Sequence, residues 1–96
     1  MKLTSKQTSY LRGLGHHLKP VVMIGKDEVS GNVVAAVDEA LEDHELIKVK
    51  LQEGCLSERR EVARELTEAT AARTVQILGK NILLYRPSKE PRIALP

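Results

Sequence analysis

The residues with the clearest chemical potential lie within 20–34, where a short apolar run meets a glycine turn and then a helical pattern. The run 21–24 is β-branched at three of its four positions and stops at Gly25; a polar turn at 26–28 follows, and helical periodicity begins after Ser30. A strand, a tight turn and a helix start are therefore predicted in immediate succession. Free backbone N–H groups and the positive end of a helix together favour a bound phosphate group. The stretch thus predicts an anion site.

The charges of the chain are strongly segregated along the sequence. Residues 1–26 hold five Lys or Arg and no acid, residues 27–45 hold seven acids and no Lys or Arg, and the remainder holds ten basic and six acidic residues. These segments carry +5, −7 and +4. Basic ends on either side of an acidic helix predict a polarised surface, which bears on the choice of partner rather than on the fold.

The residue types that support catalysis or metal binding are poorly placed. His16 and His17 are adjacent, so on a helix they point about 100° apart and do not form a ligand pair. Cys55, the only cysteine, lies near Glu53 and Glu58, and acids raise the pKa of a thiol. No glycine-rich loop ends in Lys-Ser or Lys-Thr. We therefore expect no enzymatic activity, no metal and no cofactor.

The composition predicts a cytoplasmic protein with one modest core. No apolar run approaches the roughly eighteen residues of a membrane span, and residues 1–4 lead into a helix rather than into a secretory segment. A single cysteine excludes an internal disulfide framework. The oligomeric state stays open.

The order of elements predicts an α/β (α+β) domain at 1–88, followed by an extended, proline-containing tail at 89–96. Strands separated by helices imply crossovers and parallel pairing, whereas the last two strands form an antiparallel hairpin. We expect a mixed four-stranded sheet packed with helices in the order α-β-α-β-α-β-β. The expected elements are a helix closed by Pro20, a strand at 21–24, a helix at 30–44, a strand at 47–52, a helix at 57–72, and strands at 74–78 and 82–85 joined by a hairpin at 79–81.

Hydrophobic periodicity predicts which faces of these elements are buried. Thr4 and Gln7 fit a capping box at the start of the first helix, and Ser57 is the expected N-cap of the third. The apolar first strand is expected to be covered on both faces, whereas the polar residues Lys48, Lys50, Thr74 and Gln76 predict that part of the sheet stays open. The expected core positions of the helices are Tyr10, Leu11, Leu14 and Leu18; Val33, Val37, Ala40, Leu41 and His44; and Val62, Ala63, Leu66 and Ala69.

The aromatic content indicates how the chain would bind nucleic acid. It has no Phe, no Trp and two tyrosines, Tyr10 and Tyr85. RNA-recognition motifs and OB-folds stack bases on several aromatic side chains, so both are disfavoured. A loop that clamps the sugar-phosphate backbone through N–H groups, as in KH domains, needs no aromatic residue. Tyr10 is expected in the core, and Tyr85 either packs in the core or contacts RNA.

Three segments resemble the YhbY-like proteins, the bacterial stand-alone form of the CRM (chloroplast RNA splicing and ribosome maturation) domain. They are Val22-Met23-Ile24-Gly25, the run from His44 to Lys50, and the run from Gly79 to Pro87. The resemblance covers essentially the whole chain. It implies a KH-like fold similar to the C-terminal domain of translation initiation factor three. It also implies RNA binding tied to precursors of the large ribosomal subunit, without catalysis.

The loop that contacts RNA in this family is usually Gly-x-x-Gly, and here it reads Gly25-Lys26-Asp27-Glu28. The second glycine, which tolerates positive φ, is missing. Either neighbouring cations compensate for a weak loop, or Glu28 turns outward while N–H groups still face the ligand. The alternative function is a protein-binding adaptor that docks a basic ribosomal protein on the acidic second helix. The candidate RNA-binding residues are Arg12, Lys19, Gly25, Lys26, Asp27, Glu28, Lys80, Arg86 and Lys89.

Overall fold

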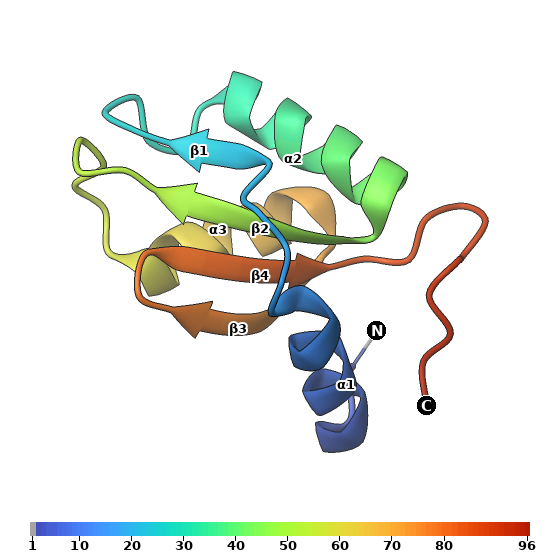
Figure 1. The fold of residues 1–96 in the computed structure, drawn as a ribbon. Coiled ribbons are helices and arrows are strands. Elements are labelled where there is room, and N and C mark those ends of the chain that lie inside the picture. The colour runs from blue at the N-terminus through green and yellow to red at the C-terminus, as the bar shows by residue number, and fades with distance from the viewer. Residues whose placement is uncertain (1) are drawn as a thin grey trace.

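The computed structural model describes residues 2–96; Met1, with which the predicted domain begins, lies outside the described residues. Within them the order of helices and strands is the predicted α-β-α-β-α-β-β (Figure 1). The elements are α1 (Ser5–Gly15), β1 (Val22–Ile24), α2 (Gly31–His44), β2 (Leu46–Leu51), α3 (Arg59–Thr70), β3 (Arg73–Leu78) and β4 (Asn81–Tyr85).

The four strands form one mixed sheet in the order β1-β2-β4-β3, which confirms the predicted α+β architecture. β1 and β2 are parallel because α2 returns the chain across the sheet between them. β4 is antiparallel to both β2 and β3. Gly79 has the positive φ of 61° that the tight β3–β4 hairpin needs, as its sequence predicts. A register shift between Thr74 and Gln76 makes β3 irregular.

The helices divide unequally between the two faces of the sheet (Figure 1). α2 and α3 cover one face, where the larger core includes Val37 and Leu66 against Ile24, Val49 and other sheet residues. α1 and the segment after β4 cover only one end of the other face, through a smaller cluster that includes Leu11 and Leu83. The rest of that second face has no helix over it. This open part of the sheet is where polar side chains of the strands reach the surface.

The predicted buried stripe of α1 is wrong at three of its four positions. Leu11 is fully buried, but Tyr10, Leu14 and Leu18 are 42%, 43% and 37% exposed. The reason is that α1 meets only one end of the sheet, so a helix face wider than the contact is left uncovered. Gly15 makes the contact close, because a Cβ there would lie only 2.5 Å from a methyl carbon of Leu83.

Two further core predictions are wrong at the ends of helices. His44, at the end of α2, is exposed. Ala69 of α3 is also exposed, and Thr70 is buried in its place, with its hydroxyl donating to the carbonyl of Leu66 at 2.7 Å. That bond satisfies the polar atom which burial would otherwise leave unpaired. Tyr85 is only 2% exposed, so it packs in the core.

The prediction that β1 is covered on both faces is also wrong. Val22 and Ile24 face the larger core, but Met23 is 53% exposed, because α1 does not extend over β1. The N-cap of α3 is Glu58, whose carboxylate accepts from the N–H of Arg60, rather than the expected Ser57. Ser57 donates its hydroxyl to Glu28 instead. The capping box of Thr4 and Gln7 is confirmed.

Candidate nucleic-acid interface

The turn after β1 keeps a glycine-like backbone at the position where glycine is missing. Glu28 has a φ of 52°, in the left-handed region that side chains rarely adopt. Its N–H donates to the carbonyl of Gly25 at 3.0 Å, and its own carbonyl accepts from the N–H of Ser30 at 3.1 Å. These bonds hold a conformation that is unfavourable by about 1–2 kcal/mol for a residue with a Cβ. The shape of the turn is therefore retained without the second glycine.

The acidic side chains of this turn are not equivalent. The Glu28 carboxylate is half-buried and accepts a hydrogen bond from the Ser57 hydroxyl, in the loop that precedes α3. Asp27 is exposed. The Glu28 carboxylate is thus directed toward a neighbouring loop. Ser30 caps α2 by accepting from the N–H of Val33 at 3.3 Å, and the first turn of α2 contains no acid.

Three loops meet at one end of the sheet, namely those after β1, after β2 and between β3 and β4 (Figure 1). Lys26 belongs to the first of these loops and Lys80 to the last. The N–H of Gln52 donates to the carbonyl of Ile24 at 2.8 Å, which ties the exit of β2 to the exit of β1. The N–H of Leu51 donates to the carbonyl of Lys80 at 2.8 Å, which ties the same exit to the β3–β4 hairpin. On the far side of this hairpin, Arg59 donates to the carbonyl of Gly79 at 2.8 Å.

Two further lysines extend this cationic edge along the open face of the sheet. In β2, Leu46 packs under α1, so the alternation of a strand puts Lys48 and Lys50 on the same, largely open face. The register sets Lys50 between Met23 of β1 and Asn81 of β4. From the sequence, Lys48 and Lys50 indicate an open sheet but are not among the candidate RNA-binding residues. Their spacing of two residues in an alternating strand was the signal that identifies them as neighbours.

Shared hollows connect these lysines to one another. Lys50 and Lys80 line one hollow together with Met23 and a single acid, Glu53. Lys48 and Lys19 line another, at the opposite end of β2. These four lysines follow β2 from one end to the other, and we call them the lysine row: Lys19, Lys48, Lys50 and Lys80. Between residues 2 and 96, no member of the row and no atom of Lys26 forms an ion pair.

Three of the predicted site residues lie outside the lysine row, although the N–H of Arg86 donates to the carbonyl of Glu45 at the end of β2 where Lys19 also lies. Arg86 follows β4, which runs away from the hairpin, and so it lies at the opposite end of the sheet from Lys80. Its guanidinium donates to Asp38 Oδ1 at 2.6 Å and to the carbonyl of Thr70 at 2.8 Å. Lys89 lies beyond Arg86, in the segment after β4, and Arg12 lies on the exposed side of α1.

A buried carboxylate that sequence reasoning did not single out fastens the segment after β4. Glu45, between α2 and β2, is fully buried. Its Oε2 accepts from the N–H and hydroxyl of Ser88, both at 2.8 Å, and its Oε1 accepts from the N–H groups of Arg92 and Ile93 at 2.9 and 2.8 Å. Burial by itself raises the pKa of this carboxyl, but these hydrogen bonds outweigh burial and hold the pKa at about 2.

Two acidic side chains of α2 form contacts within the molecule. Asp38 pairs with Arg86, Glu42 lies 3.7 Å from the same guanidinium, and the Glu42 carboxylate also accepts from the N–H of Lys89. The uncompensated negative charge of this helix is smaller than its composition suggests. That weakens the alternative in which α2 docks a basic protein.

Residues 2–96 contain no group of three or more His, Cys, Asp or Glu side chains placed to hold a metal ion. No helix among them has the length and apolar character needed to cross a membrane.

Comparison with known proteins assigns the fold and the family. The family model described as the CRS1 / YhbY (CRM) domain matches residues 3–86. An "RNA-binding protein" of Haemophilus influenzae is 42% identical, over 98% of this chain and 95% of that protein. The "probable RNA-binding protein YqeI" of Bacillus subtilis is 41% identical, over 98% and 99%. The solution structure of a Staphylococcus aureus protein superposes with a TM-score of 0.84 at 42% identity, covering 99% of this chain and all of that one. The turn at 25–28 and the lysine row therefore lie on a chain that belongs to the CRS1 / YhbY (CRM) domain family.

Proposed function

We propose that this protein is a non-enzymatic RNA-binding protein that acts in the cytoplasm on precursors of the large ribosomal subunit. The lysine row and Lys26 bind phosphates, and the backbone of the turn at 25–28 lies beside them. The names of the Haemophilus and Bacillus relatives support RNA as the ligand. The ribosomal target follows from the resemblance of the sequence to YhbY-like proteins.

The observation that carries this proposal is the lysine row itself, four cations along β2 without an ion pair among the described residues. Lys48 and Lys50 on β2, with Lys19 and Lys80 in the segments beside it, attract a polyanion and favour one direction of it across the sheet. Tyr85 is buried and Tyr10 lies on α1, so neither tyrosine offers a stacking platform on the open face of the sheet. Phosphate contacts, which position a nucleic acid without reading its sequence, are the contacts that this surface favours.

The salt dependence of binding measures these contacts directly. Each phosphate neutralised on a single strand contributes roughly −0.7 to the slope of log K against log salt concentration. The four residues of the lysine row and Lys26, five contacts in all, therefore predict a slope of about −3.5. A slope near zero in wild-type protein would contradict the proposal.

Charge-removing variants test the location of the interface. We expect Lys50→Gln combined with Lys80→Gln to weaken binding of single-stranded RNA and to reduce the magnitude of the salt slope by about 1.4. Lys2→Gln combined with Lys6→Gln removes the same charge from exposed positions at the start of α1 and serves as the matched control. Equal losses in the two double variants would show that only net charge matters and would exclude the lysine row as the site.

The ribosomal part of the proposal has its own test. Tagged protein from bacterial lysates should sediment with large-subunit precursors, and the Lys50→Gln, Lys80→Gln variant should not. Ribonuclease treatment should release the wild-type protein. Sedimentation that survives complete digestion of the RNA would point to a protein partner instead.

A further inference from the structure

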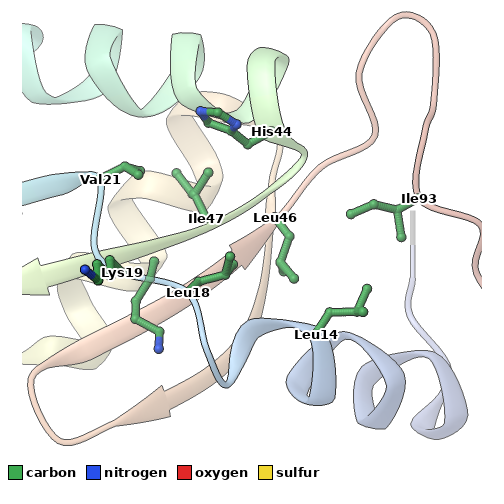
Figure 2. A pocket seen from close by; sticks show the side chains of 9 residues that line it. Leu14, Leu18, Lys19, Val21, His44, Leu46, Ile47 and Ile93 are labelled. Carbon is green, nitrogen blue, oxygen red and sulfur yellow. The ribbon is translucent and has the colours of Figure 1, made fainter.

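An apolar cavity of about 450 Å³ opens at the surface between α1 and the end of α2 (Figure 2). Figure 2 shows Leu14 of α1 and Leu18 after it on one side of the cavity, and Val21, just before β1, on another. It also shows residues of β2, His44 at the end of α2, and Ile93 from the segment after β4. The volume lies within the range of small-molecule sites. Its aliphatic walls are Leu14, Leu18, Val21, Leu46, Ile47 and Ile93.

We propose that this cavity holds one unpaired nucleobase of the RNA strand that lies along the lysine row. The inference rests on the proposed function and adds a second kind of contact to it. A base in the cavity buries its faces against aliphatic side chains while its phosphates stay at the lysines.

The apolar walls are the first reason. Leu14, Leu18 and Val21 are 43%, 37% and 52% exposed, so three large apolar side chains border one opening. Contiguous exposed apolar surface of this kind marks binding sites on soluble proteins. Single-stranded RNA presents unstacked bases, and the flat face of such a base leaves water when the base binds to a protein. Neither tyrosine is exposed on the sheet, whereas the cavity offers apolar walls that can take up such a face.

The charge of the rim is the second reason, because it selects among apolar ligands. The polar residues that line the cavity are Lys19, Lys48 and His44, and no carboxylate lines it. The apolar walls suit the face of a nucleobase, and the cationic rim suits the anionic sugar-phosphate chain that carries the base. The imidazole of His44 carries ring nitrogens that can hydrogen-bond the edge of a base.

Continuity with the lysine row is the third reason. Lys48 lines this cavity and also a smaller hollow on the open sheet face, together with Gln76 and Asn81. A strand that contacts Lys50 and Lys80 therefore meets the cavity as it passes Lys48. The phosphate contacts and the base site lie on one path.

The test compares two ligands of equal length and charge, a single-stranded RNA and the same ribose-phosphate chain without bases. We expect wild-type protein to bind the base-containing RNA at least about fivefold more tightly, near the low end of what burying one base contributes. Leu18→Gln combined with Val21→Gln should bind both ligands as weakly as wild type binds the abasic chain, with an unchanged salt slope. Leu56→Gln, at a position that is 87% exposed outside the cavity, is the matched control. Circular dichroism and thermal unfolding verify that all variants fold.

The outcomes separate this inference from the proposed function. If wild type binds neither ligand with a salt-dependent affinity, the proposed function itself fails. If wild type binds both ligands equally, or if the cavity variant keeps the wild-type preference for bases, RNA binding stands and the base site is overturned. A cavity variant with normal RNA affinity that no longer sediments with ribosomal precursors would assign the cavity to a protein partner and would also overturn it.

Discussion

Replacing Glu45 with Gln should destabilise the domain by removing one buried negative charge. The substitution keeps the size of the side chain but converts one of its two acceptor atoms into an NH₂ donor. Oε1 accepts from two backbone N–H groups, those of Arg92 and Ile93, and Oε2 accepts from two donors of Ser88. In either orientation of the Gln amide, its NH₂ group replaces one carboxylate oxygen and faces the two donors that this oxygen had accepted from. Buried donors left without an acceptor destabilise a protein strongly.

The expected magnitude follows from the shifted pKa of this carboxyl. The pKa falls from 4.5 to about 2 on folding, and each pH unit corresponds to about 1.36 kcal/mol, so the charged form stabilises the fold by at most about 3 kcal/mol. Only the segment after β4 covers the carboxylate, so water screens its charge in part and makes the stabilisation smaller than this limit. We expect Glu45→Gln to lower the free energy of unfolding by about 2 kcal/mol at pH 7. For a domain of this size, that loss lowers Tm by roughly 10 °C.

The dependence on pH provides the sharper measurement. Because folding lowers the pKa, the stabilisation is complete above about pH 5 and disappears as the pH falls toward 2. At pH 3 less than half of it should remain. Urea unfolding at a series of pH values should therefore show wild type and Glu45→Gln converging in free energy of unfolding as the pH falls from 5 to 2.

Glu39→Gln, at an exposed position of α2 without a side-chain hydrogen bond in the described structure, is the control and should stay within about 0.5 kcal/mol of wild type. Hydrogen exchange adds a local readout, since the amides of Ser88, Arg92 and Ile93 should lose protection first in Glu45→Gln. A constant difference between the two proteins across the whole pH range would refute the assignment of the stabilisation to the charged carboxylate.

Three other substitutions test the packing and the site. Gly15→Ala should lower Tm, because its Cβ would overlap the methyl groups of Leu83, whereas Gly13→Ala, with open space around it, should raise stability by up to about 1 kcal/mol in thermal unfolding. Glu28→Gly should raise RNA affinity in a binding titration by removing a negative charge from the turn, and unchanged affinity would place the turn outside the interface. Arg86→Lys should lower the free energy of unfolding by about 1–2 kcal/mol, because an ammonium group cannot reproduce the contacts to Asp38 and Thr70, while RNA affinity stays unchanged; a selective loss of RNA binding would instead return Arg86 to the site.

Much of the fold was predictable because local patterns and the topology agree. The capping box at Thr4 and the glycine of the hairpin each follow from short-range chemistry that the sequence displays directly. The proximity of Lys26 and Lys80 follows from the topology, since a strand exit and a hairpin tip meet at one sheet edge.

What could not be predicted depends on contacts between distant segments. Periodicity marks Leu14 and Leu18 as apolar positions, but it does not say that α1 covers only one end of the sheet. Glu45 is one of seven acids between 27 and 45, and only the return of the segment after β4 distinguishes it. Arg86 resembles a surface cation until its partner, Asp38, is seen 48 residues away.

The sheet order has a consequence for how molecules of this protein meet one another. Its two outer strands are β1 and β3. β1 is three residues long and follows Pro20, which lacks an N–H group, and β3 is interrupted by its register shift. Natural sheets avoid pairing with strands of other molecules by having edge strands that are short, flanked by proline or interrupted by a bulge. The margins of this sheet therefore disfavour edge-to-edge strand pairing between copies of the protein.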